Sequence, residues 1–204
     1  MPRASRTQAA TSREAITEAS ARLFKERGVK AVSVADLMSA AGLTHGGFYV
    51  HFESKDALTG IACTRAFEQA MNRWQDRTAG KSDVAAQRAA IIDGYLTPTH
   101  VSQAAEGCPT AALAVDVARE SLEASIRTAY LEGLEPMIKF LAGVENTGDD
   151  AHDRREALAD YAAMVGGLLL ARATAGHSVS QEILAAVRER LIPEHTPSQT
   201  MGAA

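Results

Sequence analysis

Helix-capping residues recur along this chain, and apolar side chains follow them at helical spacing. Thr11 with Glu14 and Ser33 with Asp36 have the spacing of a capping box, in which both side chains satisfy free N–H groups of a helix start. Alternating runs rich in Val, Ile or Thr are scarce, whereas Ala, Leu, Glu and Arg fill most long segments. The sequence therefore predicts an all-helical protein.

Caps and breaks set the expected bounds of the helices. We expect helices at residues 11–27, 33–40, 44–52, 54–78, 84–96, 109–120, 122–142, 153–174 and 180–191. Gly28 is placed to end the first helix, and Gly42 centres a tight turn between the second and third. We expect two domains, at residues 1–54 and 55–204, and loose tails at residues 1–10 and 193–204.

Charge is segregated along the chain. The net charge is −4, yet the first 60 residues hold 8 Lys and Arg against 6 Asp and Glu, while the remaining 144 hold 13 against 19. The overall charge argues against a purely electrostatic nucleic-acid binder, but the basic excess lies at one end.

Other features exclude several classes of protein. The two cysteines, without any C-x-x-C spacing, predict neither a disulfide framework nor a metal site, and no cofactor is expected. The first ten residues lack the apolar run of a secretory signal, and no apolar stretch is long enough to span a bilayer, so we expect a cytoplasmic protein. The six histidines show no H-E-x-x-H spacing, which argues against an enzyme.

Two short capped helices around Gly42 have the layout of a helix-turn-helix. The second of them contains Gly46 and Gly47, which disfavour a helix by about 1 kcal/mol each relative to Ala. Glycines on an exposed face allow a close approach to a partner, as a helix in a DNA major groove requires. Phe48 and Phe52 are interpreted as core residues of this small unit.

Residues 28–58 resemble the N-terminal domain of the TetR family of one-component transcriptional regulators. The resemblance rests on Gly28, Ser33, the run Ala41-Gly42-Leu43-Thr44, Gly46, the residues Phe48-Tyr49 and His51-Phe52, and the run Ser54-Lys55-Asp56-Ala57-Leu58. A weaker likeness to one ligand-domain subgroup of that family covers residues 95–98 and 107–113. The resemblance implies an N-terminal helix-turn-helix domain followed by a helical domain for effector binding and dimerisation.

The resemblance also implies a set of DNA contacts. Thr44 would begin the recognition helix, His45, Gly46 and Gly47 would lie near base edges, and Tyr49, His51 and Lys55 would contact phosphates. Ser33 can cap its helix while the helix start faces a phosphate, and Arg3 and Arg6 can form an arm that enters the minor groove. Residues 44–52 contain no Arg, Asn or Gln, the strong partners of guanine and adenine, so His45 is the best single candidate for base readout.

Residues 161–171 are apolar on every face of a helix, which a surface helix would not be. The resemblance places the last long helices in a four-helix dimer interface, with residues 122–141 as a partner segment; burial inside one subunit is the alternative. The expected interface residues are Tyr161, Ala163, Gly166, Gly167 and Leu170. A homodimer would match a palindromic DNA operator.

A ligand pocket is implied by the resemblance. Its candidate lining residues are Phe67, Met71, Trp74, Tyr95, His100, Cys108 and Leu113, although such a stripe is also compatible with ordinary core. Few of them are charged, which favours a small, mainly apolar effector. The sequence thus predicts a dimeric repressor released by such a ligand; the alternatives are a regulator that senses redox state through Cys108, or less favoured through Cys63, and a small helical enzyme.

Overall fold

The computed structural model describes residues 6–192, and that range contains helices and no strand, which confirms the all-helical prediction. The helices are α1 (Arg6–Arg27), α2 (Val34–Ala40), α3 (Phe48–His51), α4 (Lys55–Thr78), α5 (Val84–Tyr95), α6 (Pro98–Ser102), α7 (Pro109–Ala118), α8 (Ser125–Glu145), α9 (Asp150–Ala173) and α10 (Ser178–Leu191), with 3₁₀ turns η1 (His45–Gly47) and η2 (Ala104–Glu106). Within residues 6–192, no helix combines the length and hydrophobicity that a membrane crossing requires.

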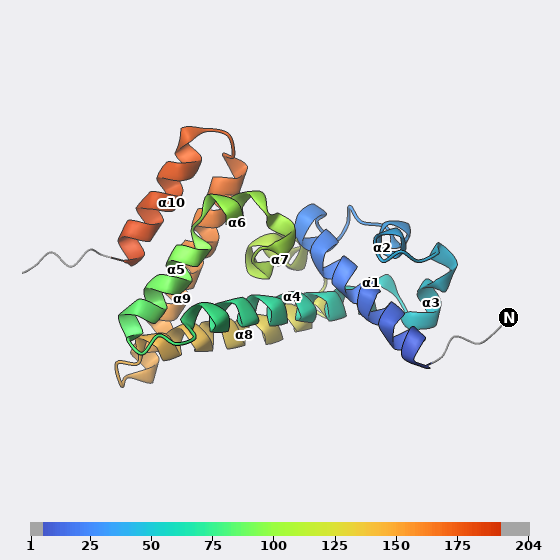
Figure 1. Cartoon of the computed structure of the whole chain (residues 1–204), viewed down its shortest axis with the longest axis horizontal. Coiled ribbons are helices and arrows are strands. Elements are labelled where there is room, and N and C mark those ends of the chain that lie inside the picture. Colours follow the sequence, from blue (N-terminus) through green and yellow to red (C-terminus); the bar gives the residue numbers. More distant parts are fainter. Residues whose placement is uncertain (1–5, 193–204) are drawn as a thin grey trace, which may run out of the picture.

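The helices divide into a small unit at one end and a larger body (Figure 1). Helices α1, α2 and α3 form the small unit, and α4 runs from it into the body beside α8. Helices α5, α9 and α10 lie at the far end of α4, and α10 packs against α9. The small unit therefore joins the body through a long shared helix.

Several predicted boundaries are wrong for local reasons. α1 begins at Arg6, and Thr11 lies inside it, because its hydroxyl donates to the carbonyl of Thr7. Two short elements were not predicted: α6, which has a side-chain cap from Thr97 and a proline at its first position, and the 3₁₀ turn η2, which has no side-chain cap. α9 begins at Asp150 because the Asp149 carboxylate accepts from the next free N–H groups.

The small unit has its own apolar core. Ile16 and Phe24 of α1, Leu37 of α2, and both Phe48 and Phe52 are at most 4% exposed. The interpretation of the two phenylalanines as core residues is therefore confirmed. The turns at Gly28 and Gly42 adopt φ angles of 80° and 70°, which residues with a Cβ rarely adopt.

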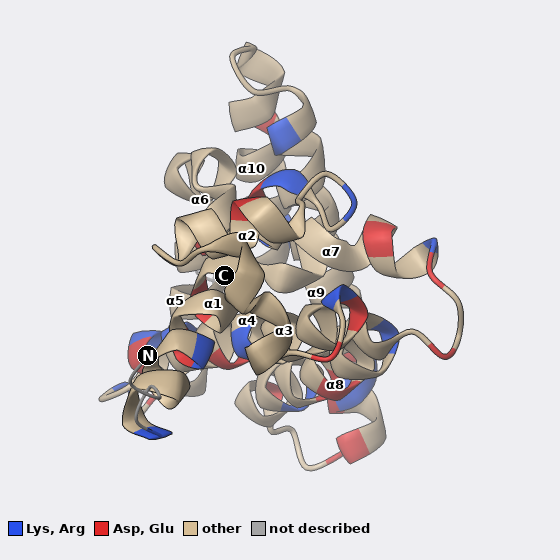
Figure 2. Cartoon of the chain, turned by 90° about the vertical axis from the view of Figure 1, so that its right-hand side faces the viewer, with Lys and Arg blue, Asp and Glu red and all other residues tan. Residues whose placement is uncertain are grey.

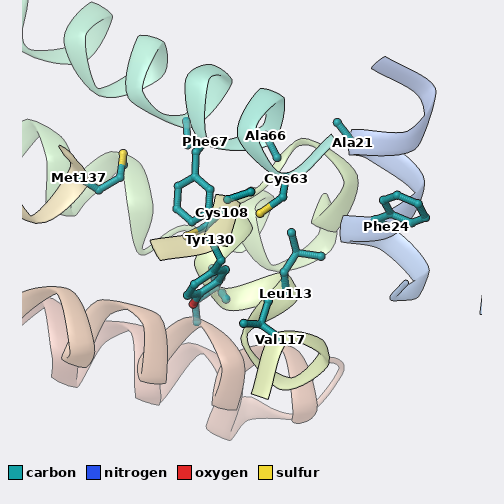
Figure 3. Packing of buried hydrophobic residues seen from close by; sticks show 14 of the residues in the cluster. Ala21, Phe24, Cys63, Ala66, Phe67, Cys108, Leu113, Val117, Tyr130 and Met137 are labelled. Carbon is teal, nitrogen blue, oxygen red and sulfur yellow. The ribbon is translucent and has the colours of Figure 1, made fainter. Parts of the chain in front are cut away.

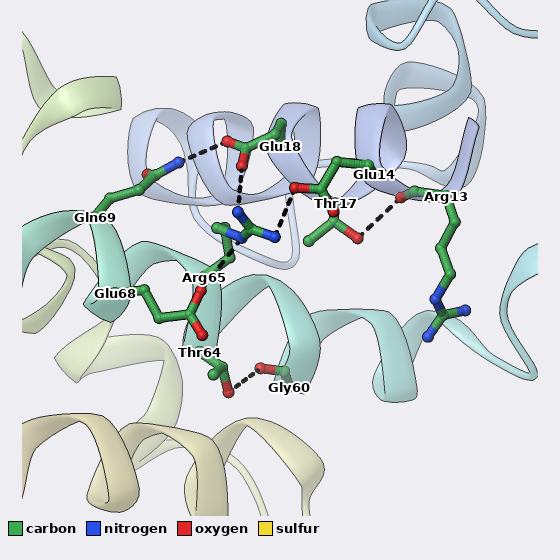
Figure 4. A network of polar contacts seen from close by, with 9 residues as sticks. All are labelled: Arg13, Glu14, Thr17, Glu18, Gly60, Thr64, Arg65, Glu68 and Gln69. Atoms are coloured by element: carbon green, nitrogen blue, oxygen red, sulfur yellow. Dashed lines mark hydrogen bonds and ion pairs between the residues drawn. The ribbon is translucent and has the colours of Figure 1, made fainter. Parts of the chain in front are cut away.

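A polar network joins α1 to α4 (Figure 4). The Arg65 guanidinium lies 2.6 Å from Glu14, 3.1 Å from Glu18 and 3.4 Å from Glu68. The Gln69 side-chain amide donates to Glu18 at 2.6 Å. Three carboxylates thus surround one guanidinium at this crossing.

α4 and α8 approach closely where small residues permit it. A Cβ at Gly60 would lie 3.0 Å from that of Ser125, whose hydroxyl donates to Asp56 at 2.6 Å. Farther along, a Cβ at Gly133 would lie only 2.3 Å from the ring of Phe67. Figure 3 shows the buried side chains of this region, including Phe67 and Cys63. The part of α4 next to the small unit is thus tightly packed on α8.

Candidate functional site

The segment after the Gly42 turn is not the single helix that was predicted for residues 44–52. It folds as the 3₁₀ turn η1 followed by one turn of α-helix, α3, and Thr44 precedes it without a side-chain capping bond. Gly46 and Gly47 account for the difference, because they weaken a regular α-helix and accept the tighter turn.

This segment presents an exposed surface that carries no Lys or Arg (Figure 2). Tyr49 is 73% exposed and Val50 is 79% exposed. Phe48, which precedes them directly after η1, is fully buried and anchors the segment. Around Gly46 a Cβ would meet nothing within 4 Å, so its outer side is open. The sequence analysis did not select Val50, although its position beside the buried Phe48 and Phe52 assigns it to the outer face.

Arg13 of α1 fixes the end of the segment, a role that the sequence analysis missed. Its guanidinium donates to the carbonyl of His51 and lies 4.3 Å from the centre of the Phe52 ring. A cation over an aromatic face is attracted by the ring quadrupole. Arg13 therefore orients the half-buried His51 relative to α1.

Ser33 and Lys55 also have partners within the chain. The Ser33 hydroxyl accepts from the Asp36 N–H at 3.1 Å. The Ser33 hydroxyl and N–H donate to the Asp36 carboxylate at 2.5 and 2.8 Å, and these two bonds hold the pKa of Asp36 below its usual value. The Lys55 ammonium donates to the carbonyl of Val29 at 2.8 Å, which leaves two further protons for another acceptor. Both residues therefore hold the unit together, whatever else they contact.

The two arginines of the predicted N-terminal arm, Arg3 and Arg6, have different outcomes. Arg3 lies outside the described residues. Arg6 is exposed but is the first residue of α1, so it is helical rather than part of an extended arm.

A second candidate site is a partly open cavity of about 170 Å³ between α4, α5 and η2. Four of the predicted pocket residues line it: Trp74, Tyr95, His100 and Cys108. The other three do not. Phe67 and Met71 line a separate groove of about 280 Å³ between α4 and α8, and Leu113 is buried in the core.

The cavity is more polar than the sequence analysis expected. Arg73, Arg77 and Glu106 also line it, which corrects the premise that few charged groups are present. The sequence placed these arginines at no site, because the residues that enclose them come from α5, α6, η2 and α8, which are distant in the sequence. Burial lowers the pKa of both arginines, since a charged group loses hydration there.

His100 is built into the cavity wall as a neutral side chain. Its Nδ1 lies 2.7 Å from the carbonyl of Tyr95, and its Nε2 accepts from the N–H of Cys108 at 2.9 Å. Burial lowers the pKa of His100 to about 4, which agrees with one donating and one accepting nitrogen. Within residues 6–192, no cluster of three or more metal-binding side chains occurs.

Two residues predicted at a dimer interface lie inside the subunit instead. Tyr161 is 3% exposed, and its hydroxyl lies 2.8 Å from that of Thr110. Gly167 faces α10, where an added Cβ would lie 3.1 Å from Val187. The apolar character of residues 161–171 thus serves packing within the subunit on these faces.

The remaining predicted interface residues leave one face of α9 uncovered. Leu170 is 58% exposed, Leu158 is 43% exposed, and a Cβ at Gly166 would meet nothing within 4 Å. Ala163 is half-buried beside them. This face is available to a partner.

Comparisons with known proteins agree with the fold and the N-terminal unit. The family model described as bacterial regulatory proteins, tetR family, matches residues 16–60. The HTH-type transcriptional repressor DhaR of Mycobacterium sp. strain GP1 is 26% identical over 188 residues, which cover 89% of this chain and 92% of DhaR. The uncharacterized HTH-type transcriptional regulator YerO of Bacillus subtilis strain 168 is 36% identical over 64 residues. The matched segment is 31% of this chain, and it spans only about a fifth (22%) of the length of YerO.

Solved structures share the fold over most of the chain. The reduced form of E. coli NemR superimposes on this chain with a TM-score of 0.74 at 23% sequence identity. The match covers 88% of this chain and 94% of the NemR chain. A TetR transcriptional regulator from Chloroflexus aurantiacus has a TM-score of 0.75 at 24% identity and covers 91% and 94%. The chain therefore contains the N-terminal helix-turn-helix unit of the TetR family and shares the fold of TetR-family regulators over most of its length, and the relatives that it matches are transcriptional regulators rather than enzymes.

Proposed function

We propose that this protein is a transcriptional repressor that binds a palindromic DNA operator as a homodimer and is released by a small molecule. The observation that carries the DNA contact is the exposed surface of η1 and α3 at the tip of the small unit. Phe48 anchors this surface from below, and Arg13 fixes its end. A rigidly held segment with exposed Tyr49 and Val50 is suited to enter a major groove.

The chemistry of the surface suggests how DNA is read. The Tyr49 hydroxyl supplies a directional hydrogen bond to a phosphate, and His45 is the candidate for a base edge. Val50 is suited to contact the methyl group of a thymine. Gly46 lets the backbone approach the groove, because no side chain stands in the way.

Selection of full-length protein on a random duplex library tests this proposal. We expect an enriched inverted repeat whose half-site centres lie about 34–36 Å apart, or a multiple of that distance. Tyr49→Phe should weaken binding to all duplexes about 5- to 10-fold without changing the salt dependence, because one hydrogen bond and no charge is lost. Val50→Ser should change the selected motif, whereas the matched control Val115→Ser, in α7, should not. Selection without any enriched motif would reject the DNA-binding proposal.

The dimer is proposed to form through the uncovered face of α9. Gly166→Leu adds a side chain on this face without meeting the chain itself, so we expect monomers in sedimentation and loss of operator binding. Gly167→Leu is the matched control, because its side chain meets Val187 of the same subunit; it should lower stability more than it changes assembly. Unchanged dimers of folded Gly166→Leu would place the interface elsewhere.

The alternative of a thiol sensor now concerns one cysteine. Burial raises the pKa of Cys63 to about 12, so this thiol stays protonated at neutral pH. Cys108 is 4% exposed but lines the cavity, with its sulfur 3.6 Å from the Tyr161 hydroxyl. Alkylation of the native protein, read by mass spectrometry, decides the matter, since an inert Cys108 at neutral pH excludes the sensor.

A further inference from the structure

The cavity between α4, α5 and η2 contains positive charge that the chain leaves without a counter-charge. Among the described residues Arg77 makes no hydrogen bond or ion pair, and Arg73 donates only to the carbonyl of Gly107, at 3.1 Å. Glu106 is the acidic residue of the lining, and its carboxylate lies 2.8 Å from Arg22 of α1 rather than in an ion pair with either cavity arginine. Half-buried cations without counter-charges are unfavourable unless another group supplies one.

A buried hydroxyl in the cavity wall is also without a partner. Tyr95 is 2% exposed, and its hydroxyl forms no hydrogen bond that meets normal geometry with a described residue. His100 cannot supply a negative charge, because it is neutral and both of its ring nitrogens are already engaged. The wall thus offers two guanidinium groups and a tyrosine hydroxyl as donors to a bound molecule.

The backbone makes room for one of these donors. A Cβ at Gly94 of α5 would lie 2.5 Å from the Nε of Arg77 and 2.8 Å from its Cζ. The guanidinium therefore lies against the bare backbone of α5, at the cavity that Gly94 itself lines. A side chain at residue 94 would displace it.

We propose that this cavity binds a small organic monocarboxylate, held by Arg73 and Arg77, with its apolar part against Trp74 and Met137. The planar guanidinium matches a carboxylate in two parallel hydrogen bonds. Two arginines and one glutamate leave one net positive charge in the lining, which a single carboxylate neutralises. A cavity of about 150 Å³ holds benzene, so a volume of about 170 Å³ suits an acid of similar size.

The position of the cavity gives such binding a route to the DNA-binding unit. η2 packs against α1, where Arg22 pairs with Glu106. Lys25 of α1 is buried, and its ammonium interacts electrostatically with both Arg73 and Glu106. A carboxylate beside Arg73 therefore changes the electrostatic environment of α1. This meaning as an effector site rests on the proposed function, whereas the binding itself does not require DNA.

Fluorescence of Trp74, the one tryptophan of the chain, tests the binding directly. We would titrate the full-length protein with acetate, benzoate and octanoate, and with the primary amide of each acid. At least one acid should change the emission saturably, and its amide should bind at least about 10-fold more weakly, because it lacks the charge. Inorganic phosphate should also bind more weakly than that acid.

Variants assign the binding to the arginines. Arg77→Gln should weaken the acid about 10-fold or more and leave the amide unchanged. Gly94→Ala keeps every charge but displaces the Arg77 guanidinium, so it should weaken the acid in the same direction. Arg190→Gln, an exposed arginine on α10, is the matched control and should have no effect. Circular dichroism of each variant verifies the helical fold.

Three results would overturn the proposal: no acid that saturates below about 10 mM, an amide or phosphate that binds as tightly as the acid, or an unchanged affinity in folded Arg77→Gln. The outcome is separable from that of the DNA experiment. Charge-dependent acid binding by a protein that selects no DNA motif would keep this site and reject the repressor. A selected DNA motif without any acid binding would keep the proposed repressor function and reject this carboxylate site.

Discussion

The arginines in the two halves of α4 have opposite electrostatic environments. Arg65, in the half that crosses α1, lies within 3.4 Å of three carboxylates. Arg73 and Arg77, beginning about two turns further along, have no carboxylate partner among the described residues and face a cavity. Arginine therefore stabilises the fold in the first half of α4. In the second half, the arginine side chains have no carboxylate partner from the described chain.

The largest effect should come from disturbing the packed half. In Gly133→Ala the new Cβ would lie 2.3 Å from the ring of Phe67, so α4 and α8 must separate or the ring must move. We expect the free energy of unfolding to fall by about 3 kcal/mol in chemical denaturation. Gly143→Ala, in the same helix but without any neighbour within 4 Å, should instead raise it by about 0.5–1 kcal/mol. Equal effects of the two substitutions would contradict the close packing.

A smaller effect of opposite sign is expected on the cavity side, at Lys25. Burial, reinforced by Arg73 and only partly offset by Glu106, lowers the pKa of Lys25 to about 8 from 10.5. The folded chain then loses this proton before the unfolded chain does, so stability should rise with pH between about 8 and 10.5. Lys25→Met should raise the free energy of unfolding at pH 7 by about 2 kcal/mol.

The control for this pH effect is the difference between parent and variant. Other groups titrate in both proteins, so thermal unfolding should be followed for each from pH 7 to 10.5. The advantage of Lys25→Met should shrink as the pH rises, because the parent loses its buried charge. A constant difference would show that the lysine carries no penalty at neutral pH.

The smallest effects compare the arginines themselves. Arg65→Gln should lower the free energy of unfolding by about 1 kcal/mol, because it leaves three partly exposed carboxylates without their cation. Arg77→Gln should change it by less than about 0.5 kcal/mol, because no ion pair is lost. Thermal melts of the two variants without added ligand provide the measurement. If Arg77→Gln destabilised the protein as much as Arg65→Gln, the contrast between the halves would fail.

Local signals explain what the sequence could predict. The capping box of Ser33, the cap at Ser54 and the left-handed glycines depend on neighbours within a few residues, and the structure contains all of them. A helical segment follows the Gly42 turn as expected, but its regularity was overestimated, because Gly46 and Gly47 favour the tighter turn. Short-range patterns thus predict where elements lie better than how regular they are.

Long-range proximity explains what the sequence could not predict. Arg73 and Arg77 resemble any solvated arginines of a helix until α5 and η2 enclose them. Lys25 occupies the last turn of α1, where a basic residue suits the helix dipole, and nothing local shows that the folded chain buries it. Tyr161 was assigned to an interface because the resemblance places the last long helices there, although its hydroxyl is bonded inside the subunit.

If α4 tilted about its close contact at Gly60 and Ser125, it would act as a lever with unequal arms. The contact lies about 8 Å along the helix from Lys55 and about 26 Å from Arg77, at 1.5 Å per residue. If α4 tilts about this pivot, a displacement at the cavity reaches Lys55 reduced about threefold and reversed in direction. Lys55 passes it on through its bond to the carbonyl of Val29, so that the loop before α2 moves with the helix. Shifts of a few tenths of an ångström at the DNA end would therefore require movements near 1 Å beside Trp74.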